Sequence, residues 1–403
     1  MLLPRMMWRR KALIIRDLYG MRCRESRLDL RRRRYRSFVN TPFCKEKALS
    51  DINVDLRDVM DIWEFKSFWK KPRPRITHFQ LRNELMCVDG GSMSVYYVAI
   101  ETSRDFYGQT VTYPIVKKLN LISGEIITVL ELKEDPFNRI STIEVSSGLL
   151  IVGTLTGSYF IHDLKTGKTT QRTLTISGNG IVNFTKTIPN TNITIFSSND
   201  RIIFEMDLHS SKTFQESHMP WAVNHISLHP LDPSLRLMAG DNINTFIFDT
   251  RINPSTPISI LRGHRDFCFT SDWSHDGLTI ATGSQDGTVR MWDVRSLKEE
   301  MRCMSGEGNS SVCTVQFNHD DPALVFSESV DYVNVVDLSC NLQNGVGNKQ
   351  CLSMFGKVAG AEFVKMDDEG GEGLVIGVSD EAIGGVLMYE RESLTKCLDY
   401  DAL

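Results

Sequence analysis

Few residues of this 403-residue chain have the types and spacing that enzymatic chemistry requires. His225 and His229 stand four residues apart, but they lie in a strand-like context, where this spacing does not make a helical pair of zinc ligands. The glycine-rich segment EGGEG at 369–373 follows two aspartates and adds two glutamates, so it would repel a phosphate and is expected to be a solvated turn. The sequence therefore predicts no enzyme, no catalytic residues, no metal, no cofactor and no small-molecule substrate.

The cysteines and the apolar segments bear on the compartment. Nine scattered cysteines without a CxxC pair argue against both a disulfide framework and a zinc site. No run of about eighteen apolar residues is present, and arginines interrupt the apolar pieces of the N-terminus. We expect a cytoplasmic or nuclear protein, or one found in both places, without a membrane span. The Arg-rich start leaves a mitochondrial presequence as the alternative.

Charge is distributed unevenly along the chain. Residues 1–40 hold thirteen basic and three acidic residues, whereas the remainder holds 33 basic and 47 acidic ones. The spacing of Leu18, Met21 and Leu28 favours a helix in this basic arm. Five arm residues combine phosphate-neutralising charge with a stacking group, and they are candidate contacts to RNA or DNA: Arg31, Arg32, Arg33, Arg34 and Tyr35. A nuclear-import signal, a partner-docking helix and an arm folded onto the acidic body are the alternatives.

A repeat organises the rest of the chain. An apolar stretch that ends on an acidic or amide residue recurs at intervals of 42 to 53 residues, ending at Asn120, Asp163, Asp207, Asp249, Asp293, Asp337 and Glu390. This period is typical of propellers in which each repeat supplies one four-stranded blade, so seven ends predict seven blades. The longer excursion in the first blade, residues 90–113, is expected to form an extended loop or a hairpin.

A propeller must also close its ring, because an unpaired outer strand leaves backbone groups exposed. The segment DIWEFKSFW at 61–69 alternates, with Trp63, Phe65 and Trp69 on one face, and we expect it to pair with the C-terminal blade. An amphipathic segment on the side of the ring is the alternative. The predicted organisation is an arm at 1–60, partly helical or disordered, a propeller at 61–392 and a tail at 393–403.

The fifth repeat carries the strongest signature. Residues 261–295, LRGHRDFCFTSDWSHDGLTIATGSQDGTVRMWDVR, resemble a WD repeat, and the resemblance to that superfamily extends over about 76–392. It implies an all-β, seven-bladed WD-repeat β-propeller with a basic, partly helical N-terminal arm. It also implies a structural tetrad, a hydrogen-bond chain that stabilises the blade, made of His264, Ser284, Asp286 and Trp292.

A narrower resemblance is to a poorly characterised group of WD-repeat proteins from plants and fungi. Besides the fifth repeat, it rests on ITHFQLRN at 76–83, MPWAVNHISLHP at 219–230, FGKVAGAEF at 355–363 and GVSDEAIGGVLMYER at 377–391. The leader RESRLDLRRRRYRSFVN at 24–40 matches that group more loosely.

One motif suggests a partner. The end of the fifth repeat, Trp292 to Arg295, resembles the WD-x-Arg box with which substrate receptors dock on the adaptor of cullin-RING ubiquitin ligases. The resemblance makes Asp293 and Arg295 candidate docking residues, and FDTR in the preceding repeat places Arg251 equivalently. Ordinary surface hydrogen bonds are the alternative. The leading prediction is a non-enzymatic scaffold with protein partners. A ligase receptor and a nucleic-acid-associated protein are the other two.

Overall fold

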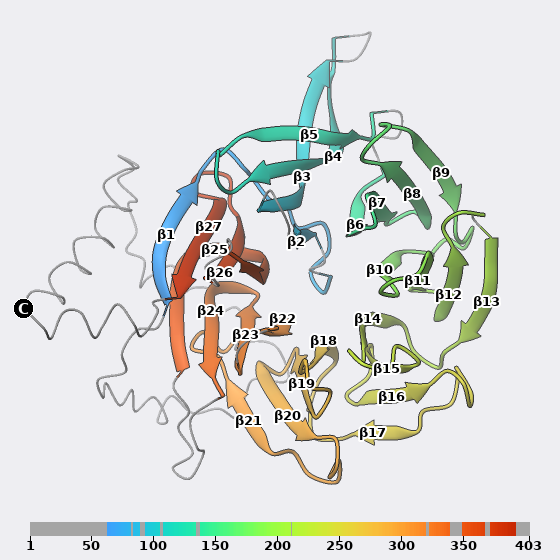
Figure 1. The fold of residues 1–403 in the computed structure, drawn as a ribbon. Coiled ribbons are helices and arrows are strands. Elements are labelled where there is room, and N and C mark those ends of the chain that lie inside the picture. The colour runs from blue at the N-terminus through green and yellow to red at the C-terminus, as the bar shows by residue number, and fades with distance from the viewer. Residues whose placement is uncertain are drawn as a thin grey trace, which may run out of the picture. The chain divides into compact units, whose positions relative to one another are not determined.

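The computed structural model describes residues 63–81, 84–88, 93–104, 108–133, 138–210, 212–319, 322–338, 349–366 and 371–391, and every regular element in them is a β-strand. The expected basic arm, its predicted helix and the C-terminal tail lie outside these residues. Antiparallel sheets stand around a central channel like the blades of a propeller (Figure 1). The all-β class predicted from the repeat is confirmed.

Five blades are separate four-stranded sheets. Blade one contains β2 (Leu85–Val88), β3 (Ser94–Arg104), β4 (Thr110–Asn120) and β5 (Ile126–Glu131), and blade two contains β6 (Ile140–Ser146), β7 (Leu149–Thr154), β8 (Ser158–Asp163) and β9 (Thr169–Thr173). Blade three contains β10 (Val182–Thr187), β11 (Ile193–Ser198), β12 (Ile202–Asp207) and β13 (Lys212–His218). Blade four contains β14 (Val223–Leu228), β15 (Leu235–Gly240), β16 (Thr245–Asp249) and β17 (Ser259–Leu261). Blade five contains β18 (Cys268–Trp273), β19 (Thr279–Ser284), β20 (Thr288–Asp293) and β21 (Arg302–Ser305).

Blades six and seven form one seven-stranded sheet because they share a strand. Blade six contains β22 (Val312–Phe317), β23 (Ala323–Glu328), β24 (Val330–Asp337) and the first part of β25 (Lys349–Lys365). Blade seven contains the second part of β25, β26 (Glu372–Ser379), β27 (Gly385–Arg391) and β1 (Trp63–Trp69). Lys357 is the turning point, since it pairs with Val330 on one side and with Ser379 on the other.

The recurring acidic or amide residue has a local structural cause. It closes the third strand of a blade, and its side chain accepts hydrogen bonds from the backbone of the following turn. Asp163 Oδ1 accepts the N–H groups of Lys165 and Thr166 at 2.8 and 2.9 Å, and Asn120 Oδ1 does the same in blade one. Asp207, Asp249 and Asp293 also accept the N–H two residues ahead, whereas Glu390 pairs with Lys66 of β1. The repeat is visible in the sequence because the first five blades use the same turn chemistry.

The strand β1 closes the ring. It pairs antiparallel with β27, from Trp63 opposite Arg391 to Trp69 opposite Val386, so the predicted closing strand is confirmed. The prediction that its three aromatic residues share one face is wrong. A register shift between Phe65 and Ser67 reverses the alternation, so Trp63 and Phe65 pack among blade six and seven residues, while Trp69 packs against the core between blades seven and one.

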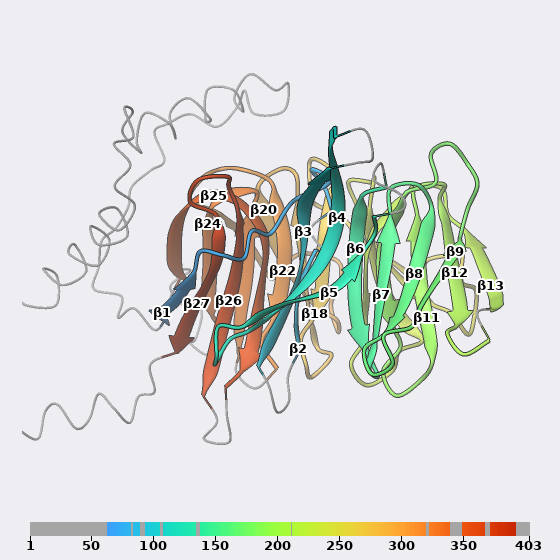
Figure 2. The ribbon, with the colours of Figure 1, turned by 90° about the horizontal axis from the view of Figure 1, so that it is seen from above.

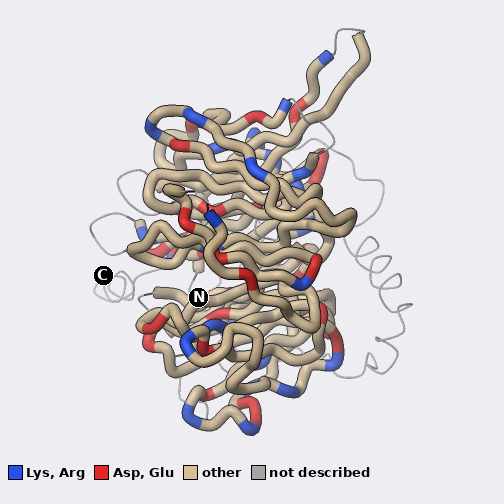
Figure 3. The backbone as a smooth tube through the Cα atoms, turned by 90° about the vertical axis from the view of Figure 1, so that its right-hand side faces the viewer, with Lys and Arg blue, Asp and Glu red and all other residues tan. Residues whose placement is uncertain are grey.

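The two faces of the ring carry different connections (Figure 2). In a four-stranded meander, the turn between the second and third strands lies at the same edge as the segments that link one blade to the next. We call this edge the connector face. The opposite edge, with the first–second and third–fourth turns, is the turn face. The hairpin β3–β4 pairs from Ser94 opposite Asn120 to Arg104 opposite Thr110 and projects beyond the ring (Figures 1 and 3), which confirms the expected hairpin.

Candidate interaction surfaces

The tetrad region of blade five centres on a buried imidazole. His264, 5% exposed, lies on the segment between blades four and five. Its Nε2 lies 2.8 Å from the Thr282 hydroxyl, its Nδ1 lies 3.2 Å from Asp286 Oδ2, and its ring meets the Trp292 ring edge-on at 6.2 Å. Burial disfavours the charged form of Asp286, but the hydrogen bond and charge of His264, with further donors, lower its pKa below the usual range. These polar groups satisfy one another inside the blade.

The structure corrects one member of the predicted tetrad. The strand hydroxyl that bonds His264 belongs to Thr282, whereas Ser284 donates to the carbonyl of Asp266 at 3.1 Å and accepts the Asp286 N–H at 3.1 Å. Both hydroxyls lie on the same face of β19, one pleat repeat apart. Ser284 ends the strand and reaches the loop backbone, which leaves Thr282 to meet the ring. Two adjacent hydroxyl positions in TGS could not be distinguished by spacing.

The connector face contains a cavity that the sequence analysis missed. It measures about 210 Å³ and lies between the connections of blades three and four. Its lining is mixed, with one aromatic ring among polar groups: Asn179, Asn199, Arg201, Pro220, Trp221, Ala222 and Asp241. Trp221 stacks on Phe246 at 4.0 Å, and its Nε1 is buried without a hydrogen-bond partner. The segment MPWAVN contained the signal, since its tryptophan lies in the connection between blades three and four, which runs on this face.

Exposed apolar side chains lie on the connections of the same face, and we call them the apolar rim. The large ones are Phe79 (63% exposed), Ile176 (96%), Ile243 (47%) and Phe267 (38%). Phe79 approaches the cavity through its neighbour, because Gln80 Nε2 lies 3.4 Å from Asp241 Oδ1. Asp241 also accepts a hydrogen bond from Asn224 at 2.9 Å. A polar cavity and an apolar rim on one face are an arrangement suited to holding a side chain of a partner.

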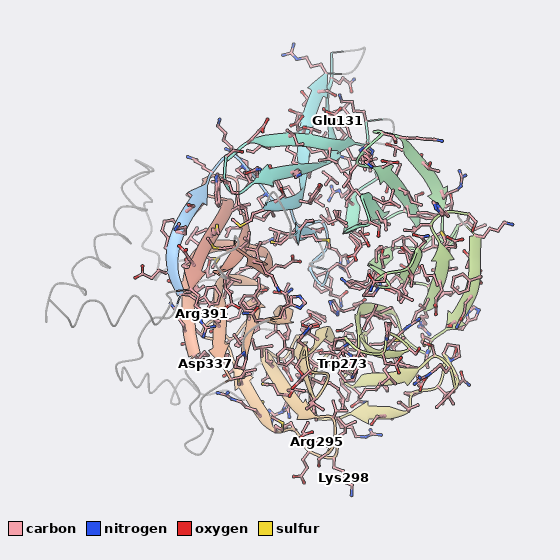
Figure 4. All side chains as sticks on the ribbon, in the orientation of Figure 1. Glu131, Trp273, Arg295, Lys298, Asp337 and Arg391 are labelled. Atoms are coloured by element: carbon pink, nitrogen blue, oxygen red, sulfur yellow. The ribbon has the colours of Figure 1, made fainter. Side chains whose placement is uncertain are left out.

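The predicted docking residues lie together on the turn face of blades four and five. In Arg295, Nε and Nη2 donate to the two carboxylate oxygens of Asp293 at 2.9 and 2.6 Å, and Arg251 repeats this fork with Asp249 at 2.9 and 2.8 Å. The Arg295 hydrogen bonds lower the pKa of Asp293 to about 2. Arg295 and Lys298 extend outward from blade five (Figure 4). The side chains of Arg251 and Arg295 remain 59% and 73% exposed.

Apolar residues lie beside these guanidinium groups. Leu231, Ile252 and Leu278 are 76%, 74% and 44% exposed on the neighbouring turns. The two blades meet here, because His229 of blade four packs edge-on against Trp273 of blade five at 4.8 Å. The two Asp–Arg forks and the three apolar residues therefore belong to adjoining turns.

The other residues with possible chemistry are separated from each other. His225 lies in β14 with its ring 4.5 Å from Phe184, while His229 contacts blade five. Among the described residues, no group of three His, Cys, Asp or Glu could hold a metal ion. The same part of the chain contains no helix long and apolar enough to cross a membrane. Glu372 and Gly373 of the predicted solvated turn belong instead to β26, because Glu372 pairs with Lys365.

Comparisons with known proteins agree with this fold. The model of the WD domain, G-beta repeat, matches residues 255–293. The target of rapamycin complex subunit LST8 of Saccharomyces cerevisiae is 33% identical over 86 residues, which cover 21% of this chain and 27% of that protein. The human (Homo sapiens) THO complex subunit 6 is 33% identical over 78 residues, covering 19% of this chain and 22% of that protein. These matches span only about a quarter of each relative.

A solved structure extends the likeness to most of the chain. A chain in the crystal structure of the mitotic checkpoint complex superposes with a TM-score of 0.63 at 16% identity, covering 81% of this chain and 94% of that one. The fold and the blade-five repeat thus define a WD-repeat β-propeller. Residues 255–293 match the WD repeat, and the chain as a whole has the propeller fold. The closer resemblance to a plant and fungal group stays a prediction.

Proposed function

We propose that this protein is a non-enzymatic scaffold that binds other macromolecules, with its principal binding surface on the connector face around Trp221 and Phe79. The observation that carries the proposal is the cavity beside Trp221 together with its exposed apolar rim. Several relatives bear names of complex subunits, which supports an assembly role in general terms. A rigid ring with variable loops suits this role, and we expect it to act in the cytoplasm, the nucleus or both.

The surface can contribute binding energy in two ways. Phe79 exposes apolar area to water, which a partner side chain would cover. Each Å² of apolar area removed from water contributes roughly 25 cal/mol to binding. The polar lining offers side-chain donors at the cavity, among them Asn199 and Arg201, so an oxygen of the partner would gain a hydrogen bond there. We expect a protein segment that places an apolar group on Phe79 and a carbonyl or carboxyl oxygen in the cavity.

A matched pair of variants tests this proposal. Phe79→Asp places a charge on the connector face, and Ile122→Asp places one on the turn face, at residues that are 63% and 64% exposed. Partners recovered with tagged protein by quantitative mass spectrometry should fall with Phe79→Asp and persist with Ile122→Asp, while circular dichroism remains unchanged in both. Retention of every partner by Phe79→Asp would reject this surface.

A second candidate is a substrate receptor of a cullin-RING ubiquitin ligase that docks through the turn face. It is favoured by the exposure of Arg251 and Arg295 and by the apolar residues beside them. Arg251→Glu with Arg295→Glu should abolish recovery of the ligase adaptor. Lys165→Glu, at the corresponding turn position of blade two, is the control and should not. Absence of the adaptor from wild-type purifications would eliminate this candidate.

A third candidate is association with RNA or DNA through the arm residues 31–35, motivated by their charge. Neutralising several phosphates makes affinity fall steeply with salt. Fluorescence polarisation with a labelled single-stranded RNA and DNA should show this dependence for the full chain, and removal of residues 1–40 should abolish binding. Binding that survives the truncation would place the contact elsewhere.

A further inference from the structure

The central channel is lined by a belt of side chains that ties the blades together. The first strands of all seven blades contact one another in a closed circle. One residue from each stands at an equivalent level, and we call this set the channel belt: Met86, Glu144, Lys186, Ser227, Asp272, Gln316 and Glu362.

Most belt members bond to the backbone of the next blade's first strand. Glu144 accepts the Thr187 N–H at 3.4 Å, and Met86 Sδ accepts the Val145 N–H at 3.0 Å. Further around the ring, the same relation recurs in three links: Phe317 N–H to Asp272 at 2.9 Å, Phe363 N–H to Gln316 at 3.0 Å and Cys87 N–H to Glu362 at 2.6 Å. The last link joins blade seven to blade one, where the ring closes.

Two members differ. The Ser227 hydroxyl donates to the carboxylate of Asp272 at 2.9 Å. Lys186 carries an ammonium, which cannot accept an N–H. Its Nζ lies 3.5 Å from Glu144, and 38% of its side chain contacts solvent in the channel. The charge of Glu144 raises the pKa of Lys186 despite the surrounding protein, and Glu362 and Asp272 raise it further. Lys186 is therefore the shared counter-charge of three belt carboxylates.

A buried imidazole, that of His225, also lies near the belt, and the Cys87 thiol bonds Glu362. Burial lowers the pKa of His225 to about 3, with Lys186 contributing, so its imidazole is neutral near pH 7. Three ionised carboxylates would then face one ammonium. All three carboxyls resist this state, and for Glu144 the cause is burial, which raises its pKa. Burial raises the pKa of Asp272 to about 6, and burial with the charge of Glu144 raises that of Glu362 to about 7 against the opposing effect of Cys87 and Lys186.

We propose that the channel belt is a pH-sensitive closure of the ring, in which the junction of blades seven and one, where Cys87 donates to Glu362, is most stable when Glu362 carries a proton. Ionisation of Glu362 adds a third negative charge opposite one ammonium and draws water into the closing junction. The side chains that determine this response are Glu144, Lys186, His225, Asp272 and Glu362.

The direction of the pH effect follows from the two states. The pKa of Glu362 is about 7 in the folded protein against 4.5 ordinarily, so its favourable contribution is complete below pH 4.5 and is lost as the pH rises through 7. Asp272 acts likewise between pH 3.8 and 6. His225 acts oppositely between pH 6.5 and 3, because the unfolded chain binds its proton first. Comparing wild type with a Glu362 variant separates the contribution of Glu362 to the pH dependence of stability from these opposing effects.

The test uses the purified full chain and Glu362→Gln, whose amide oxygen still accepts the Cys87 N–H but cannot ionise. Thermal and urea unfolding are followed from pH 5 to 8.5, with Glu64→Gln, an exposed carboxyl on β1 of the same blade, as the control. We expect Glu362→Gln to match wild type at pH 5 and to gain stability above it. The ratio of the folding equilibrium constants should change by about tenfold per pH unit toward pH 7. Glu64→Gln should follow wild type throughout.

A second readout addresses the junction itself. Hydrogen exchange of the Cys87 amide, corrected for its intrinsic pH dependence, should accelerate as the pH rises from 5 to 7 in wild type and not in Glu362→Gln, while the Val145 amide stays unchanged. Lys186→Met should be less stable than wild type, with a larger deficit at pH 8.5 than at pH 5. The proposal is overturned if Glu362→Gln is equally or less stable at every pH, or if exchange at Cys87 does not depend on Glu362.

Discussion

A buried ion pair between blades three and four offers a quantitative test of what holds the ring together. Arg236 on β15 donates to both carboxylate oxygens of Glu205 on β12, at 2.7 and 3.0 Å, and the two side chains are only 4% and 7% exposed. Removing one partner leaves a buried charge without its counter-charge, which typically costs about 3–5 kcal/mol. We expect Arg236→Met to lower the free energy of unfolding by this amount.

The double variant Arg236→Met, Glu205→Met separates the pair from its context. Replacing both charges with apolar side chains is often neutral or stabilising, so it should recover most of the loss. Urea unfolding at pH 7 measures both effects. Lys66→Met, which breaks the exposed pair with Glu390 at 2.5 Å, is the control and should cost under about 1 kcal/mol. A double variant as unstable as the single one would refute the reasoning, because the loss would then come from packing and not from an orphaned charge.

Three further predictions concern the blades themselves. Thr282→Val should cost about 1–3 kcal/mol and shift the imidazole resonances of His264, whereas Ser284→Ala should leave those resonances in place, as NMR of the histidine ring can show. Gly240→Ala should cost about 1–3 kcal/mol, because its new Cβ would overlap the Ala222 carbonyl oxygen, while Gly178→Ala meets no atom and should be silent in thermal unfolding. Asp286→Asn should be less stable than wild type at pH 6. The difference in the free energy of unfolding should narrow as the pH falls below about 4, because a carboxyl with a depressed pKa contributes its full stability only above its unfolded pKa. A difference that stays constant down to pH 3 would contradict this.

The repeat made the fold predictable, because its signal comes from local turn chemistry. Asp163 and its equivalents in the first five blades accept the N–H group two residues ahead, so the pattern is written in the sequence where these third strands end. The closing strand was predictable for a similar reason, since its alternation is local. Its bulge between Phe65 and Ser67 was not, because the register depends on packing against β27.

The candidate sites were less accessible to sequence reasoning. The arginines of the WD-x-Arg boxes could be placed on one face from the sequence. Their forked hydrogen bonds with Asp249 and Asp293 could not be predicted, because they depend on the geometry of the folded turns. The cavity beside Trp221 draws on segments up to 62 residues apart, Asn179 to Asp241, that only the ring brings together. The channel belt was equally hidden, because Glu144 and Glu362 become neighbours of Lys186 only after all the blades have assembled.

Because β1 closes the ring, closure can occur only after the last strand of the propeller has been synthesised. Trp63 and its partner Arg391 are 328 residues apart. The strand β1, the first of the propeller to leave the ribosome, therefore stays unpaired until β27 has been synthesised. At roughly 5–20 residues per second, that interval is on the order of tens of seconds. Throughout it, an aromatic strand with two unpaired edges is open to other chains. Folding therefore depends on shielding of Trp63–Trp69 during translation. The yield of folded protein should respond to chaperone supply more strongly than the free energy of unfolding of the folded protein suggests.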